Sequence, residues 1–169
     1  MPFHISIAII SSFVFSGAIF GFFYAWVCST MWGLDAADPR VAISAMQAMN
    51  ASVRNAVFFP AFFLTPLVLF GSALLVWKSK FPKAALGLLS ASAIYVVGAL
   101  GVTVGFNVPM NEALAMVEVP TDRAAAALIW ESYSPAWQVW NIIRTVACLL
   151  VVTLVGWSAM QMCRPAEAG

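Results

Sequence analysis

The chain has 169 residues, of which 63% are hydrophobic and only 9% are charged, and its formal net charge is +1. This length leaves room for a single transmembrane domain, residues 1–169, with short connections and no large soluble domain. The balanced charge argues against a nucleic-acid partner. The cysteines are widely separated and form no C-x-x-C pair, which argues against a thiol-oxidising membrane enzyme.

The first predicted span covers residues 5–32, inside a run without charged side chains. A run of about 18 or more apolar residues is long enough to cross the hydrocarbon core as a helix. No basic segment precedes this run and it is longer than the apolar region of a signal peptide, so we expect a retained span. Gly17, Gly21 and Ala25 recur at every fourth position, which predicts a face for close helix packing.

Residues 33–54 are expected to form an outer loop. Gly33 should end the first helix, and Asp38 followed by Pro39 has the pattern of an N-cap and a first helical position. The following residues, 40–55, have a helical pattern of mixed polarity. We expect them to extend the second span outwards as an amphipathic segment.

The second span is predicted at residues 55–77 and the third at residues 84–106. Pro60 and Pro66 lie inside the second span, and each removes a backbone donor, so a bend is expected. The bend is either a structural kink or a device that widens a cavity on the outer side.

Residues 107–136 are expected to form the second outer loop, and the fourth span follows at residues 137–162. Pro109 should begin one short helix in this loop, and Thr121 or Asp122 should cap another. Both short helices are expected to lie over the outer end of the bundle as a lid.

Together these elements predict an all-α membrane protein, an antiparallel bundle of four transmembrane helices with short extramembrane helices over its outer end. Basic residues in short loops set the orientation of such a protein. Lys78, Lys80 and Lys83 between spans two and three, and Arg164 after span four, predict that both termini are cytoplasmic. Small-residue faces are also compatible with a homo-oligomer. The glycines expected to face other helices are Gly17, Gly21, Gly98 and Gly101.

Three polar motifs are predicted to meet at the outer end. One precedes the second span, one ends the third and one begins the fourth, and helical spacing places the side chains of the first and last motifs on one face each. We expect all of these residues to line one pocket. They are Gln47, Asn50, Arg54, Asn107, Asn111, Trp137, Trp140, Asn141 and Arg144.

Arg144 is the deepest of these residues, more than two turns into the fourth span. An unpaired charge in hydrocarbon costs at least about 2.5 kcal/mol, and the four apolar runs contain no acidic residue. Arg144 must therefore meet amide or backbone oxygens, a loop carboxylate such as Glu112 or Glu131, water or a ligand. Alternatively, Arg144 and Arg54 reach the headgroups, and the amides only cap helix ends.

The chemistry of the motifs favours a hydrophobic aromatic or lipid-like ligand with oxygens at one edge. Guanidinium and amide groups donate hydrogen bonds to oxygens, and indoles offer flat apolar faces. Arg54 and Arg144 are the candidate catalytic residues, because both would stabilise an oxyanion. The amides and tryptophans of the motifs are the candidate substrate-binding residues: Gln47, Asn50, Asn107, Asn111, Trp137, Trp140 and Asn141.

Neither a metal nor another cofactor is expected. His4 is the sole histidine and lies at the predicted inner end, far from the motifs. This placement argues against a bis-histidine haem and against a multi-histidine metal centre within one chain.

At these residues the chain resembles the anthrone oxygenase-like family of small membrane proteins. The resemblance covers nearly the whole chain and rests on the order and spacing of its motifs. It implies a four-helix membrane protein, and fungal members of the family oxidise anthrones to anthraquinones with molecular oxygen and without an evident cofactor. The matching residues are Gly17, Gly21, Phe22, Tyr24, Trp26, Met46, Gln47, Met49, Asn50, Arg54, Asn107, Pro109, Asn111, Trp137, Trp140, Asn141 and Arg144.

Two functions fit these motifs. The first is a cofactor-independent oxygenase or oxidase of an anthrone-, phenol- or quinol-like substrate, which needs a flat binding site, an oxyanion stabiliser and a base. The base is unassigned, and Glu112, Glu118, Asp122 and Glu131 are candidates that otherwise are solvated loop charges. The second is a non-enzymatic membrane module that binds lipid or quinone, or an accessory subunit of a larger membrane complex.

Overall fold

The structure is a computed structural model that describes residues 2–163, so the prediction that used Arg164 lies outside the described residues. Helices account for nearly all of that part of the chain, and three of its elements are π-helical turns, labelled η. The elements in order are α1 (Phe3–Ala25), η1 (Trp26–Thr30), α2 (Met31–Ala36), α3 (Pro39–Ser52), α4 (Phe58–Lys78), α5 (Pro82–Tyr95), η2 (Val96–Gly101), η3 (Thr103–Asn107), α6 (Val108–Ala115) and α7 (Arg123–Cys163).

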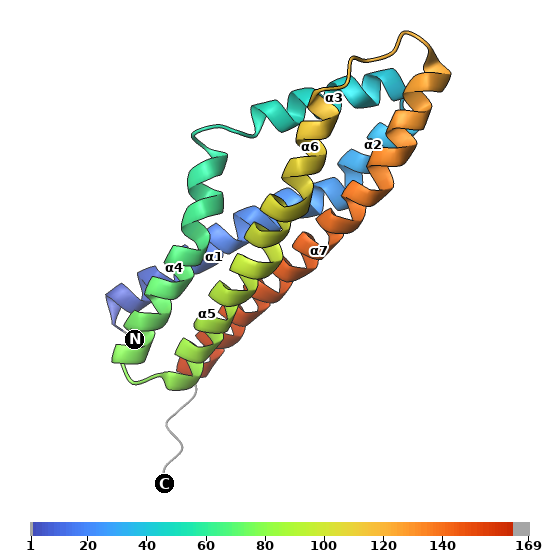
Figure 1. The fold of residues 1–169 in the computed structure, drawn as a ribbon. Coiled ribbons are helices and arrows are strands. Elements are labelled where there is room, and N and C mark those ends of the chain that lie inside the picture. The colour runs from blue at the N-terminus through green and yellow to red at the C-terminus, as the bar shows by residue number, and fades with distance from the viewer. Residues whose placement is uncertain (1, 164–169) are drawn as a thin grey trace.

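Four continuous helical stretches are long and apolar enough to cross a membrane, which confirms the predicted four-helix membrane bundle. The first stretch runs from α1 through α2, the second is α4, the third runs from α5 through α6, and the fourth is α7. α1 and α5 each pack on both α4 and α7, so the four stretches form a ring of antiparallel neighbours. Figure 1 shows α3 at one end of the bundle, called the α3 end below, and the turn between α4 and α5 at the other end, beside the start of α1 and the end of α7.

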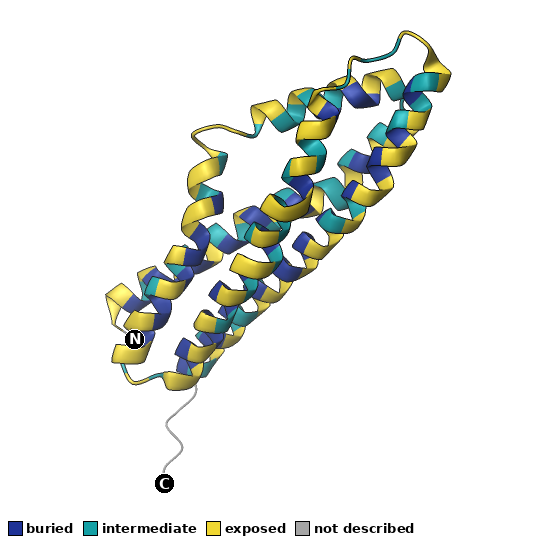
Figure 2. Ribbon diagram, in the orientation of Figure 1, coloured by how far each residue is buried: buried dark blue, intermediate teal, exposed yellow. Residues whose placement is uncertain are grey.

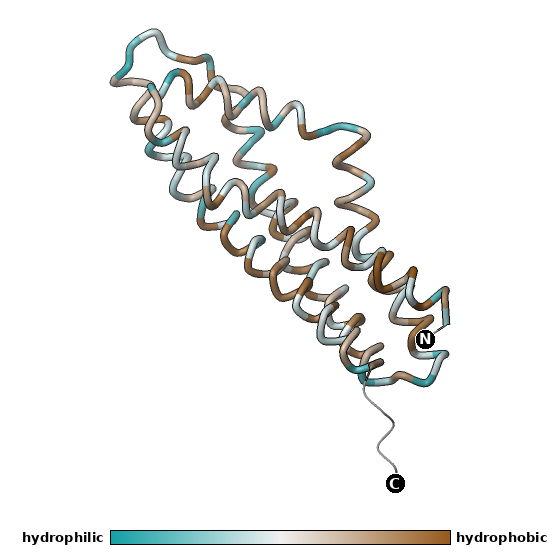
Figure 3. The backbone as a smooth tube through the Cα atoms, turned by 180° about the vertical axis from the view of Figure 1, so that it is seen from behind, coloured by the Kyte–Doolittle hydropathy of each residue, from teal (hydrophilic) through white to brown (hydrophobic). Residues whose placement is uncertain are grey.

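The core is apolar and lies along the axis of this ring. Ile19, Leu69, Leu88 and Val151, one from each stretch, are almost fully buried there. Figure 2 shows that residues facing away from the axis are exposed, and many of these are apolar, such as Leu67. Figure 3 shows hydrophilic residues at the α4–α5 turn and around the α3 end. This distribution is typical of a bundle whose middle contacts lipid.

The expectation that residues 40–55 extend the second span is wrong. α3 is a separate helix that packs on α6 and α7, and the non-helical residues 53–57 separate it from α4. Asn55 explains the break, because its side-chain oxygen accepts hydrogen bonds of 2.9 Å from the backbone N–H groups of Val57 and Phe58. This local capping starts a new helix in a new direction.

The expected lid over residues 107–136 is also wrong. α6 continues the third stretch, α7 begins at Arg123 and runs through Pro135, and only residues 116–122 lie outside helices between them. Pro109 is the second residue of α6 and directly follows the π turn η3, so it does not begin a separate helix. Gly33 likewise does not end the first helix, which continues to Ala36.

Of the two prolines expected to bend the second span, only Pro66 lies in the interior of α4, since Pro60 falls in its first turn. Pro66 cannot donate a hydrogen bond to the carbonyl of Phe62, four residues earlier. The hydroxyl of Tyr95 from α5 donates to that carbonyl at 2.8 Å instead. The proline therefore creates an acceptor that a neighbouring span satisfies.

The glycine-face prediction is confirmed only in part. Gly98 packs closely on α7, where an added Cβ would lie 2.5 Å from another side-chain atom. An added Cβ at Gly17 or Gly21 would meet open space, and Gly101 is exposed. Among the described glycines, Gly87 also forces a close approach, against the end of α7. The helix spacing of small residues did not distinguish lipid-facing positions from packed ones.

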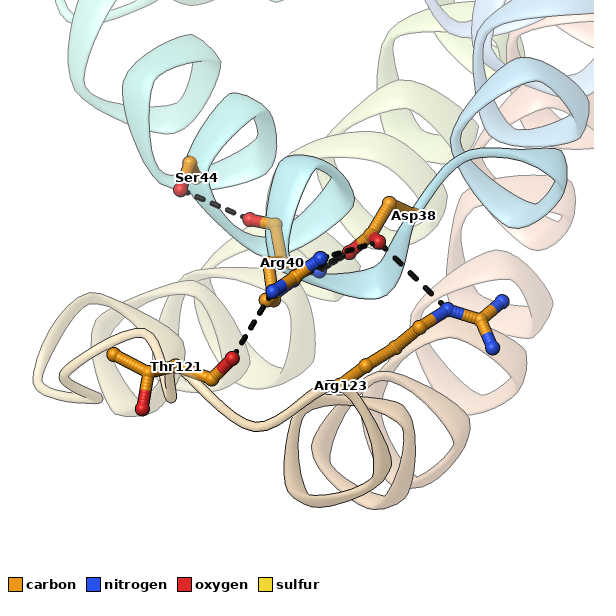
Figure 4. Close-up of polar contacts among 5 residues, drawn as sticks. All are labelled: Asp38, Arg40, Ser44, Thr121 and Arg123. Atoms are coloured by element: carbon orange, nitrogen blue, oxygen red, sulfur yellow. Dashed lines mark hydrogen bonds and ion pairs between the residues drawn. The ribbon is translucent and has the colours of Figure 1, made fainter.

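Asp38 and Pro39 start α3 as predicted, and they also fix its position. Asp38 accepts a hydrogen bond from the backbone N–H of Arg40 at 3.0 Å and pairs with its guanidinium at 2.9 Å. Arg40 then donates to the carbonyl of Thr121 at 3.0 Å, and Arg123 approaches Asp38 to 3.7 Å (Figure 4). These contacts fasten α3 to the connection before α7.

Candidate functional site

A cavity of about 300 Å³ lies inside the bundle towards the α3 end. Side chains from all four stretches and from α3 form its wall, and aromatic residues are the largest group among them. The aromatic wall residues are Phe22, Phe23, Trp26, Phe58, Phe59, Phe62, Phe63 and Trp137.

Two of the π-helical turns lie at the level of this cavity. η1 supplies Trp26 to the wall, and η3 supplies Thr103 and Val104. A π turn widens a helix locally and often accompanies a functional site. In η1, the hydroxyl of Thr30 donates to the carbonyl of Ala25 at 3.2 Å, which supports the wider turn.

Arg144 lies in the cavity wall and is only 5% exposed. Its guanidinium donates to Thr103 of the third stretch at 3.2 Å and to the side-chain oxygen of Asn141 at 2.9 Å. The rings of Phe23 and Trp137 lie 4.4 and 5.3 Å from its central carbon, so cation–π attraction adds to these bonds. Arg144 is thus held inside the bundle by neutral groups.

The charge of Arg144 is not compensated by an acid. Within residues 2–163, none of the ion pairs includes Arg144. Its Nε is buried and has no hydrogen-bond partner among the described residues. A buried cation with a free donor is expensive, and an anionic or oxygen-bearing ligand would satisfy both needs.

Asn50 contributes a second free donor to the same wall. Its side-chain nitrogen is buried and, in the described part of the chain, donates no hydrogen bond of good geometry. Asn111 has the opposite role, because its side-chain oxygen already accepts bonds of 2.8 Å from both Tyr133 and Trp137. That pair of bonds fixes the indole of Trp137 against the cavity.

A charged pair stands where the cavity approaches the surface. Arg54 and Glu112 form an ion pair at 3.3 Å, and both side chains are more than half exposed. Together with Asn50 and Asn111 they also line an outer groove of about 510 Å³. These four side chains therefore separate the aromatic cavity from the surface at the α3 end.

Five of the residues predicted for the pocket lie in the cavity wall: Asn50, Arg54, Asn111, Trp137 and Arg144. The other four stand outside it. Asn141 and Asn107 are buried behind the wall and bind the carbonyls of Phe23 and Trp137. Gln47 donates to two carbonyls at the end of the α6 stretch. Trp140 stacks on Phe106, with the ring centroids 3.6 Å apart.

Sequence reasoning missed the phenylalanines of the wall. The chain contains three Phe-Phe pairs, at 22–23, 58–59 and 62–63, and all six rings line the cavity. Their repetition was a signal, but in an apolar chain it resembles ordinary span composition. Glu112 was treated as a loop charge because α6 was not expected to continue the third span.

Asp35 was also missed. It accepts hydrogen bonds from Trp130, Ser134 and Gln138 at 2.9, 2.6 and 2.9 Å. These three residues are spaced four apart and lie on one face of α7. The contact joins α2 to α7 beyond the cavity and has a structural role.

A family model described as anthrone oxygenase matches residues 49–154, more than half of the chain. The matched range includes Asn50, Arg54, Glu112, Trp137 and Arg144. Neither the curated proteins nor the solved structures contain a match to the chain. The resemblance expected from the motifs is therefore confirmed, and the chain belongs to the anthrone oxygenase family.

Proposed function

We propose that this protein is a membrane-embedded, cofactor-independent oxygenase of an anthrone-, phenol- or quinol-like substrate bound in the aromatic cavity. One observation carries the proposal. The cavity combines flat aromatic walls with two buried, unpartnered donors, Arg144 Nε and Asn50 Nδ2, when only the described residues are counted. Unsatisfied buried donors call for acceptors, so the matching ligand is a flat ring system with oxygens on one edge.

The chemistry that such a site supports begins with loss of a proton from the ring carbon of an anthrone. The resulting enolate is electron-rich and passes electrons to molecular oxygen, and a carbon–oxygen bond forms. The peroxide anion takes up the proton that the base removed, and the hydroperoxide then loses water to give the second carbonyl. One anthrone and one O₂ thus yield one anthraquinone and one water. Arg144 and Asn50 stabilise the enolate oxygen, and Trp137 and Phe23 hold the ring.

The base in this proposal is Glu112. Of the described residues in the cavity wall, it is the one that carries a carboxylate. The same side chain lines the outer groove, so a proton taken from the substrate has a route to water. Arg54 pairs with this carboxylate and orients it.

The decisive experiment compares wild type with variants at Arg144. Each protein is purified in lipid nanodiscs and supplied with a panel of anthrones and hydroquinones. Wild type should consume oxygen and form quinone. Arg144→Leu should lose activity by about 100-fold or more while remaining folded, and Arg144→Lys should recover only part of it, because lysine lacks the planar fork. Binding of these compounds without turnover would instead favour a non-enzymatic module that binds lipid or quinone.

We also infer the orientation of the bundle. Lys80 lies in the α4–α5 turn, and Lys78 and Lys83 lie in the helices on either side of it, which favours a cytoplasmic position for that end. The start of α1 and the end of α7 lie at the same end, so both termini would be cytoplasmic (Figure 1). The cavity and its charged pair would then lie towards the outer side.

A further inference from the structure

A second, apolar groove of about 440 Å³ opens beside the aromatic cavity, between α1 and the start of α4. We propose that this groove binds an apolar chain carried by the same ligand, so that the substrate class is a hydroxyaromatic with an alkyl or prenyl tail. This inference rests on the proposed function, since it assumes that the aromatic head occupies the cavity.

The continuity of the two spaces is the first argument. Five wall residues belong to both: Phe22, Trp26, Met49, Val53 and Phe58. Phe22 and Phe58 meet with their ring centroids 4.7 Å apart. These two side chains, from different stretches, therefore form much of the wall between the groove and the cavity. Rotation of either ring would join the groove to the cavity without movement of the backbone.

The position of the groove is the second argument. α4 packs on α1, α5 and η2, but in the described chain none of its Cα atoms lies within 8 Å of a Cα atom of η1 or α3. The helix backbones are therefore well separated at the level of the groove. Of the six groove residues that are not shared with the cavity, Ser52 and Asn55 are polar and the other four are small or aliphatic: Ala18, Ile19, Val57 and Ala61. A flexible hydrocarbon chain fits such a wall, whereas a polar substituent would lose its hydrogen bonds there.

A comparison within the molecule shows that this continuity is specific. Another lateral apolar groove, about 220 Å³ in volume, lies near the α4–α5 turn and includes Leu74 and Leu86. None of its described wall residues belongs to the cavity wall. A lipid chain can rest in either groove, but only the one beside α1 can receive a tail whose head occupies the cavity.

The test measures binding in nanodiscs by tryptophan fluorescence, with 1,8-dihydroxyanthraquinone and a derivative that carries a ten-carbon alkyl chain. Ala18 and Ala61 line the groove and not the cavity, so Ala18→Phe and Ala61→Phe are chosen to fill the groove. Each should weaken binding of the tailed compound about tenfold and leave the untailed compound unchanged. Ala93→Phe, the same change at an exposed position of α5, is the control and should alter neither affinity.

Each compound is compared between wild type and variants. Partitioning of its tail into the bilayer therefore affects all the measured affinities equally and does not change their ratio. Unchanged affinity for the tailed compound in both groove variants would overturn the inference and leave the groove to membrane lipid. Equal losses for both compounds would also overturn it, because the groove would then serve the head. If wild type fails to bind the untailed compound, the proposed function fails instead.

Discussion

At the scale of single residues, Glu112 differs from the other acids among residues 2–163 by its place in the cavity wall. Glu112→Gln keeps the size of the side chain and removes the basic oxygen. The turnover number should fall by about 100-fold to 10,000-fold, while affinity for a non-reactive hydroxyanthraquinone changes little. Steady-state oxygen consumption and binding titrations measure the two effects separately.

The matched control is Glu118→Gln, an exposed acid in the connection that follows α6 and outside the cavity wall. It should retain wild-type turnover. Glu112→Asp should restore part of the rate, since it keeps a carboxylate at a shorter reach. Wild-type turnover in Glu112→Gln would show that the proton leaves by another route.

Tyr95 offers a test of the bundle itself. Its hydroxyl is buried and donates to the carbonyl that Pro66 leaves without its helical donor. Tyr95→Phe should therefore lower the stability in detergent by about 1 kcal/mol, because the carbonyl of Phe62 becomes unsatisfied. Tyr24→Phe, at an exposed ring, is the control and should leave the melting temperature unchanged. Equal melting temperatures for wild type and Tyr95→Phe would mean that the carbonyl finds another donor.

At the scale of elements, the start of α3 depends on a carboxylate outside the spans. The hydrogen bonds that Arg40 donates hold the pKa of Asp38 at about 2, below its usual value of 3.8. A group whose pKa is lowered by folding stabilises the folded state above its unfolded pKa, and this contribution is lost as the pH falls through the folded value. The contribution of Asp38 should therefore be complete above about pH 4 and disappear towards pH 2.

This dependence can be measured by thermal unfolding in detergent at several pH values between 6 and about 2. Asp38→Asn retains a capping oxygen but not the charge, so its melting temperature should fall less on acidification than that of wild type. Asp122→Asn is the comparison, since Asp122 caps the start of α7 through the backbone N–H of Ala125 without pairing to Arg40. Parallel curves for wild type and Asp38→Asn would show that the contact with Arg40 does not stabilise α3.

The sequence predicts the spans of this protein better than their connections, for physical reasons. Long apolar runs are specified by the bilayer, so each predicted span falls on one of the four stretches. The third and fourth stretches extend beyond the predicted spans, to Ala115 and from Arg123. Whether a helix continues past the membrane depends on tertiary contacts. Asp35 joins α2 to α7, and Gln47 joins α3 to the end of α6, and neither contact follows from local spacing.

The site shows the same limit. Arg144 was found because a charge inside a span demands a partner, whatever the fold. Helical spacing placed Trp140 and Asn141 on the same side of α7 as Arg144, but sharing a helix face does not decide which side chains reach a cavity. Trp140 stacks on Phe106 instead, and Asn141 holds the guanidinium of Arg144 from behind.

At the scale of the whole molecule, the lysines of the α4–α5 turn predict which end faces the cytoplasm. In a background without the exposed cysteines Cys28 and Cys163, Asp122→Cys should react with a membrane-impermeant maleimide added to intact cells. Lys80→Cys should react only after permeabilisation, because it lies in the turn at the opposite end of the bundle (Figure 1). The reverse labelling pattern would place the aromatic cavity and the Arg54–Glu112 pair on the cytoplasmic side. Glu112 would then exchange its proton with the cytoplasm rather than with the outer compartment.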